Sequence, residues 1–203
     1  RLSLIATAVA TASLSIGQAT TLTWDHDADG TASDGGGTWL NANQWLDGPN
    51  PATWNNATPD DAVIGSSNGT GGTIDLTGGV TVGDATFDNF TGKYVLSNDT
   101  LTIAPGGTLT WGPNTTASGS NEGVEFANTS TLVGDATTTI LVNGNYPVDK
   151  SRGQFNVRTA DISGFVGTYD VRNGVLFTEP AGGGVPAANS IINPDAAAPA
   201  PGP

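Results

Sequence analysis

Apolar and polar residues alternate in short runs between positions 74 and 177. Each run places two apolar residues at i and i+2, which is the pattern of a strand with one buried face. The pairs are Ile74/Leu76, Val80/Val82, Ala85/Phe87, Tyr94/Leu96, Leu101/Ile103, Leu109/Trp111, Val124/Phe126, Ile140/Val142, Phe155/Val157, Tyr169/Val171 and Val175/Phe177. Turn residues separate the runs, as in Gly78-Gly79, Ser97-Asn98 and Asn173-Gly174. The pattern predicts a chain of very short strands.

The spacing of these pairs favours a parallel β-helix over a β-sandwich. A sandwich is expected to repeat its strands every 8–12 residues or so, with hairpin turns. A step of three strands is 20 residues from Ile74 to Tyr94 and 21 from Val80 to Leu101. These steps match one coil of a solenoid, roughly 20–45 residues. We therefore predict an all-β, single-stranded parallel β-helix over residues 66–179, with four or five coils between Ile74 and Phe177.

Four tryptophans, Trp24, Trp39, Trp45 and Trp54, lie in a segment rich in Gly, Asn and Asp that precedes the repeats. No helix or strand period accounts for their spacing. The terminal repeat of a solenoid is atypical because it has to cover an open apolar end. We predict that residues 20–65 form a tryptophan-rich N-terminal cap.

The two ends of the chain differ from its middle. Arg1 precedes an apolar, alanine-rich stretch that ends in Gly17-Gln18-Ala19, which is typical of a secretory signal cleaved after Ala19. A signal peptide over 1–19 implies an extracellular or cell-surface location. We also predict a helix over Leu2–Ile16 and no membrane insertion of the mature chain. Residues 180–203 are rich in Ala, Pro and Gly and are predicted to be a tail or linker.

Charge and composition exclude several classes of function. The net charge of −13 disfavours binding to nucleic acids and anionic lipids. Cysteine does not occur, which excludes disulfides, thiol catalysis and cysteine-ligated zinc.

The same segments resemble a known family in sequence order. The matching pieces are Trp24-Asp25, Gly37-Thr38-Trp39, Asn43-Gln44-Trp45, Thr53–Asn56, Asp60–Gly65, Gly79–Phe87, Lys93–Leu96, Leu101–Ile103 and Ser163–Tyr169. Over about 20–178 the chain resembles the autotransporter-associated β-strand repeat proteins, which bacteria secrete or display on their surface. The resemblance implies a right-handed β-helix of the passenger type and supplies no catalytic residues.

Asp25, Asp27 and Asp29, followed by Gly30, resemble the start of a calcium-binding loop. Calcium prefers six to eight oxygen ligands, and a glycine at this position permits a sharp turn. The position of the closing glutamate is occupied by Gly36. The motif therefore leaves two interpretations open, a calcium site and a solvated acidic loop. His26 lies in the same loop and is predicted to be an exposed loop residue.

Two carbohydrate-related alternatives also remain. The tryptophans, Trp39 and Trp45 among them, could stack on sugar rings. A polysaccharide hydrolase or lyase would need paired charged groups on one face, and the mixed-charge cluster is Asp149, Lys150, Arg152, Arg158, Asp161 and Asp170.

We favour a secreted or surface-displayed, non-enzymatic module of structural or adhesion type. The alternative is an extracellular β-helix that binds or cleaves polysaccharide. We predict no catalytic residue, no metal ligand and no cofactor. The partner is an unknown extracellular one, a polysaccharide or a cell surface.

Overall fold

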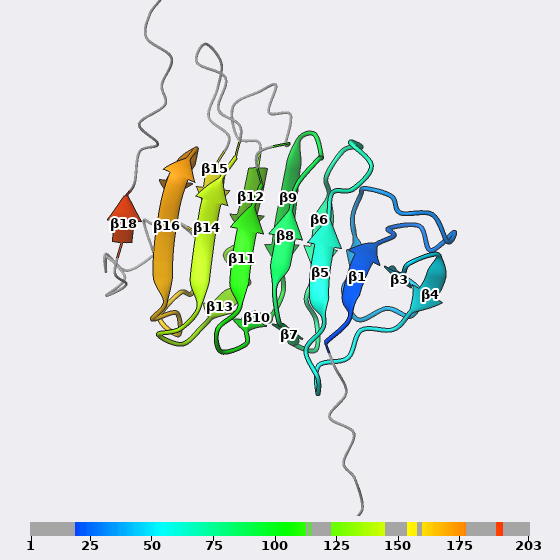
Figure 1. The fold of residues 1–203 in the computed structure, drawn as a ribbon, viewed down its shortest axis with the longest axis horizontal. Coiled ribbons are helices and arrows are strands. Elements are labelled where there is room, and N and C mark those ends of the chain that lie inside the picture. Colours follow the sequence, from blue (N-terminus) through cyan, green and yellow to red (C-terminus); the bar gives the residue numbers. More distant parts are fainter. Residues whose placement is uncertain are drawn as a thin grey trace, which may run out of the picture.

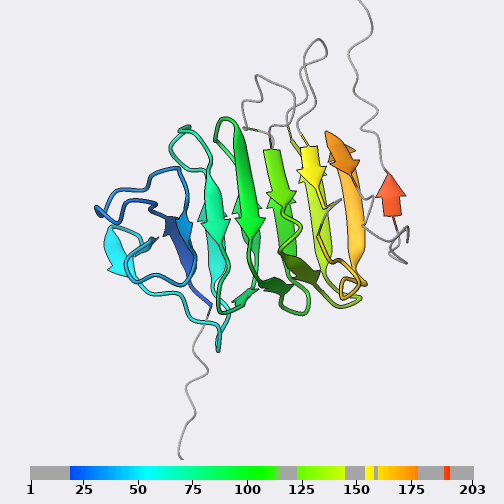
Figure 2. The same cartoon turned by 180° about the vertical axis from the view of Figure 1, so that it is seen from behind.

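The computed structural model describes residues 19–112, 114, 123–144, 154–157, 160–177 and 190–192, and all of its regular structure is β. Its strands form three sheets (Figures 1 and 2). No helix that could span a membrane occurs within these described ranges. The all-β prediction is confirmed. The helix predicted over Leu2–Ile16 and most of the predicted tail lie outside the described residues.

The long sheet contains nine strands. In spatial order they are β18 (Ser190–Ile192), β16 (Thr168–Asn173), β14 (Thr139–Asn143), β11 (Thr108–Trp111), β8 (Ala85–Phe87), β5 (Asp61–Ile64), β1 (Thr21–Trp24), β3 (Trp45–Asp47) and β4 (Asn50–Ala52). The six-stranded sheet has the order β17 (Val175–Phe177), β15 (Gln154–Asn156), β12 (Gly123–Phe126), β9 (Lys93–Ser97), β6 (Thr73–Asp75) and β2 (Gly37–Thr38). The three-stranded sheet comprises β13 (Thr131–Val133), β10 (Thr100–Ile103) and β7 (Val80–Val82).

From β5 onward the chain visits the long, six-stranded and three-stranded sheets in turn. Every strand pair in this part is parallel, for example β8 with β11 and β9 with β12. One circuit through the three sheets is called a pass. Among the described residues between β15 and β16, the chain forms no strand of the three-stranded sheet, and the isolated bridges Asp161–Thr131 and Phe165–Gly134 take that place. Parallel pairing between successive passes is consistent with a β-solenoid and excludes hairpins through residues 74–177 of the described chain.

The register agrees with the prediction in one sheet and differs in another. Val80 pairs with Leu101, as the 21-residue step predicts. Ile74 pairs with Leu96 rather than with Tyr94, and Tyr94 pairs with Val124. Tyr94 and Leu96 both point inward, so a slip of two residues keeps the buried face unchanged. Alternation therefore identifies the face of a strand but leaves its register open to such slips.

The interior is built from the inward-facing side chains of the strands. Ile74, Leu101 and Val157, which the alternation places inside, are fully buried. Between the strands, left-handed backbone occurs where turns were expected, as at Gly78, Gly79 and Asn98. Such conformations are natural for Gly and Asn.

The segment before β5 departs from the parallel pattern. β3 pairs antiparallel with both β1 and β4 at one end of the long sheet (Figure 1). The edge strand β4 contains Pro51, which has no N–H to offer to another strand, and proline in sheets is largely confined to such edges.

The four tryptophans of this segment form one buried cluster. Trp45 lies at its centre, with ring centroids 5.0 Å from Trp24, 5.0 Å from Trp39 and 4.8 Å from Trp54. The Trp45 indole N–H donates to the carbonyl of Trp39 at 2.8 Å. Trp54 donates to the carbonyl of Thr81 at 3.2 Å, which connects the cluster to β7. The cluster therefore packs on the parallel strands rather than standing apart from them.

Candidate functional site

The loop that follows β1 brings three acidic side chains together. Asp25, Asp27 and Asp29 each offer a carboxylate oxygen within 4.8 Å of the other two. Asp25 is fully buried at the end of β1, whereas Asp27 and Asp29 are exposed. The loop turns sharply because Gly30 adopts a φ of +90°, a conformation that glycine tolerates without strain. The sequence motif thus forms a true spatial cluster.

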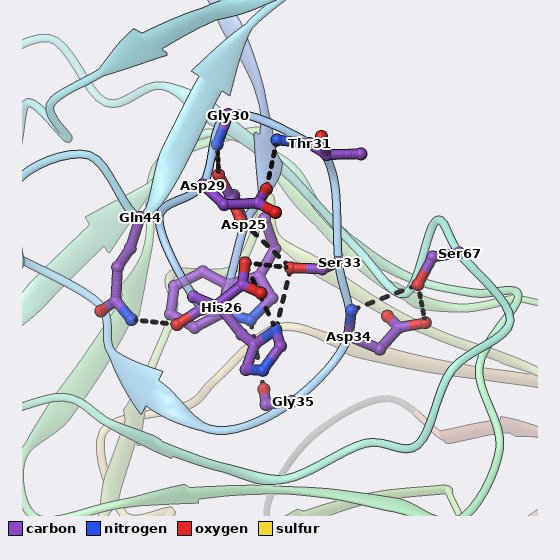
Figure 3. A network of polar contacts seen from close by, with 12 residues as sticks. Asp25, His26, Asp29, Gly30, Thr31, Ser33, Asp34, Gly35, Gln44 and Ser67 are labelled. Carbon is purple, nitrogen blue, oxygen red and sulfur yellow. Dashed lines mark hydrogen bonds and ion pairs between the residues drawn. The ribbon is translucent and has the colours of Figure 1, made fainter.

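Hydrogen bonds already engage these carboxylates (Figure 3). The backbone N–H of Gly30 donates to Oδ2 of Asp25 at 2.8 Å, and that of Thr31 donates to Oδ1 of Asp29 at 2.8 Å. The Ser33 hydroxyl lies 3.1 Å from Oδ1 of Asp25 and 3.0 Å from Oδ1 of Asp27. The pKa of Asp27 is lowered below its ordinary value. The largest cause is a side-chain hydrogen bond with Asp25, and the next largest is the hydrogen bond from Ser33.

The cluster contains part of what a calcium ion needs. Three carboxylates and the Ser33 hydroxyl face one another, but calcium takes six to eight oxygens, and a bidentate carboxylate normally completes a loop of this kind. That position is Gly36, which carries no side-chain oxygen. Both oxygens of Asp25 also accept hydrogen bonds from the loop itself. The geometry therefore favours a loop stabilised by its own donors.

We expect millimolar calcium to leave the melting temperature of the chain unchanged, and chelator to have no effect. A ligand that binds the folded state at a hundred times its Kd stabilises it by about 2.7 kcal/mol, an effect that thermal unfolding detects easily. Isothermal calorimetry gives the second readout, with Asp27→Asn as the matched variant. A calcium-dependent rise in melting temperature that this variant abolishes would contradict the expectation and establish a calcium site.

His26 and Ser33 lie close together in the same loop. Nδ1 of His26 is 2.8 Å from the Ser33 hydroxyl and 4.0 Å from Oδ1 of Asp27. A Ser-His-Asp triad needs serine and aspartate on opposite nitrogens of the imidazole. Here one nitrogen faces both groups, and the serine hydroxyl also faces two carboxylates. The arrangement is a polar network that orders the loop. His26 is half-buried, whereas the sequence predicted an exposed loop residue.

Asp34 forms a second network that the sequence did not single out. Its Oδ2 accepts bonds from the Ser67 hydroxyl and the Gly69 N–H, both at 2.6 Å, and its Oδ1 accepts from the Tyr94 hydroxyl at 2.8 Å. Burial, together with the Asp34 carboxylate, raises the pKa of Tyr94 well above its ordinary value. One buried carboxylate thus joins the loop after β1 to two later passes of the chain.

The tryptophans do not form an exposed platform for sugar rings. Trp24, Trp39 and Trp45 have no exposed surface, and Trp54 retains 6%. The fifth, Trp111, is also fully buried, on β11. A platform needs an open ring face, so the sugar-stacking interpretation of Trp39 and Trp45 conflicts with their burial. Their apolar area is used within the protein.

The mixed-charge cluster does not come together as a catalytic pair in the part of the chain that is described. Asp161 bridges to the three-stranded sheet, whereas Asp170 lies on β16 of the long sheet, paired with Arg172 at 2.8 Å. The N–H of Ser163 donates to the Asp161 carboxylate and lowers its pKa, which disfavours a role as general acid. Asp149, Lys150, Arg152 and Arg158 lie outside the described residues.

Comparison with known proteins finds an adhesin. The chain is 38% identical over 87 residues to a protein described as "Adhesin BmaC autotransporter" from Brucella suis biovar 1 (strain 1330). The match covers 39% of this chain and 2% of that protein. No protein-family model matches the chain, and no solved structure matches it.

The chain is therefore similar to a small part of an autotransporter adhesin. The similarity agrees with an autotransporter relation and leaves the type of repeat open.

Proposed function

We propose that the chain is a non-enzymatic, adhesin-like module displayed on a bacterial cell surface. The observation that carries the proposal is the similarity to an autotransporter adhesin. Consecutive parallel passes support it because solenoids present long, regular faces for contact.

The proposed architecture is a right-handed β-helix of autotransporter-associated β-strand repeats, with residues 20–65 as its cap. Crossovers between parallel strands of one sheet are right-handed in nearly all proteins. The cap assignment is supported by the antiparallel β3 and β4, by the edge proline Pro51 and by the buried tryptophans. We assign residues 1–19 to an export signal and 66–179 to the repeats.

Surface display tests the proposal most directly. The full chain is produced in a Gram-negative host with a C-terminal epitope tag, and intact cells are treated with external protease. We expect the protease to remove the tag while a periplasmic marker persists, and the producing strain to adhere to epithelial monolayers severalfold better than a vector strain.

A tag that becomes accessible only after the outer membrane is opened would contradict surface display. Equal adhesion of the two strains would contradict the adhesive role. Incubation of the purified chain with neutral and acidic polysaccharides should release no reducing ends. Release that disappears in Asp161→Asn would support a polysaccharide-cleaving enzyme instead.

A further inference from the structure

Each of the three sheets ends, on its N-terminal side, in a strand whose outer edge has no further strand beside it. These end strands are β4 in the long sheet, β2 in the six-stranded sheet and β7 in the three-stranded sheet. The free N–H and C=O groups of an end strand are a template for pairing with another chain. On β4 the middle residue is Pro51, which removes one of the donors. The other two end strands contain no proline.

Backbone geometry decides which groups of β7 face its free edge. The N–H of Ala104 donates to the carbonyl of Val82 at 2.8 Å, so the backbone groups of Val82 face β10. Because the backbone groups of successive strand residues point to alternate sides, the N–H and the carbonyl of Thr81 face the free edge. Just after β7, the N–H of Gly83 lies on that side too and donates to the Asp60 carbonyl at 2.9 Å.

Two side chains occupy this edge of β7. The N–H of Thr81 donates to Oδ1 of Asn56 at 2.9 Å, and the Thr81 carbonyl accepts from the indole N–H of Trp54 at 3.2 Å. The Asn56 amide also donates to the carbonyl of Gly79 at 2.8 Å. Asn56 thus offers one acceptor and one donor along the strand, as the backbone of a neighbouring strand would.

Gln44 has the same role at the edge of β2. The N–H of Trp39 donates to the carbonyl of Asp75 on β6 at 2.9 Å, so the N–H of Thr38, one residue earlier, points to the free side. This N–H donates to Oε1 of Gln44 at 2.9 Å. The Gln44 side chain is buried, and its amide donates to the His26 carbonyl at 2.7 Å, which fixes its orientation (Figure 3).

The hydrogen bonds that an earlier pass would make are therefore supplied by side chains of the segment itself. We propose that Gln44, Trp54 and Asn56 close this end of the stack against strand pairing with a second copy of the chain. Two copies that met at an open end would pair β7 with β7 about a two-fold axis, which gives an isologous, antiparallel contact. This control of self-association goes beyond the proposed adhesive function and does not depend on it.

The test uses the full chain with Asn56→Ala and a matched control. Asn56 is exposed, so its replacement leaves the interior intact. Asn55→Ala makes the same change one residue earlier, where the side chain bonds to Thr58 Oγ1 at 2.7 Å and to the Ala57 N–H at 2.9 Å, both in its own turn. Light scattering after size-exclusion chromatography measures the mass at concentrations up to about a millimolar. Hydrogen exchange, read by mass spectrometry, measures the protection of the Thr81 amide.

We expect the parent and Asn55→Ala to keep a constant monomer mass. The mass of Asn56→Ala should rise about twofold with concentration, as for a two-fold dimer. In the dilute variant the Thr81 amide should exchange about tenfold faster than in the parent, the order expected for one lost hydrogen bond. Protection should return as the mass doubles, because the second copy then accepts from Thr81.

A monomeric Asn56→Ala with a rapidly exchanging Thr81 amide would overturn the inference, because an open edge would then recruit no second copy. Association without renewed protection of Thr81, equal association of Asn55→Ala, or dimerisation of the parent would overturn it as well. Circular dichroism shows whether each variant is folded. Asn56→Asp keeps an oxygen for Thr81 and loses the donor to Gly79, so it should associate less than Asn56→Ala, and it serves as the test if the alanine variant does not fold. Surface display and adhesion measure a different property, so the failure of either proposal leaves the other standing.

Discussion

Replacement of Trp45 by alanine is expected to lower the free energy of unfolding by about 3–5 kcal/mol, the range for a large buried aromatic side chain. Trp45 is fully buried and contacts three other tryptophans, so its loss opens a cavity that rigid indole rings fill poorly. It also removes the donor to the Trp39 carbonyl. For a chain of this size the melting temperature should fall by roughly 6–20 °C. Far-ultraviolet circular dichroism measures the transition without depending on tryptophan emission.

Asp47→Ala is the matched control, because Asp47 lies on the same strand β3 and is exposed. Its effect should stay within about 0.5 kcal/mol, as for most surface changes. A decrease below about 1 kcal/mol for Trp45→Ala would contradict a structural role for the cluster. It would favour tryptophans that the fold can spare for a ligand.

Much of the repeat region can be predicted from the sequence because a single physical rule governs it. A strand with one buried face must alternate, and alternation is visible residue by residue, as in Val80/Val82 and Leu101/Ile103. The rule does not distinguish registers that differ by two residues, which is why the 20-residue step from Ile74 leads to Tyr94 whereas the structure pairs Ile74 with Leu96. Coil length also changes, since Leu101 pairs with Val80 21 residues before it and with Leu132 31 residues after it.

The polar networks were harder to predict because they join residues distant in the chain. Asp25, Asp27 and Asp29 could be recognised as a cluster because they lie within one loop. Asp34 meets its partners only after the chain has completed later passes, at separations of 33 residues to Ser67 and 60 to Tyr94. A lone aspartate beside glycines resembles an ordinary turn residue. A sequence signal for Asp34 would require the register of Tyr94, which alternation does not supply.

Asp34→Ala is expected to lower the free energy of unfolding by about 2–4 kcal/mol, because it leaves a buried donor without its charged acceptor. The Tyr94 hydroxyl is enclosed and its bond to Asp34 is buried, so water cannot easily replace the carboxylate. The Ser67 and Gly69 donors are nearer solvent and contribute less. Urea unfolding followed by circular dichroism measures the change, and Tyr94→Phe completes a double-mutant cycle that isolates the pair.

The double variant Asp34→Ala/Tyr94→Phe should be less unstable than the sum of the two single changes, by about 1–2 kcal/mol, because the second change removes the orphaned hydroxyl. Asp29→Ala is the control, since Asp29 is exposed and accepts from the neighbouring Thr31 N–H alone among the described residues. It should cost less than about 1 kcal/mol. Additive effects of Asp34→Ala and Tyr94→Phe would show that the two groups do not interact in solution. The loop after β1 would then be held to the later passes by the tryptophan cluster and the backbone pairing of β1 and β2.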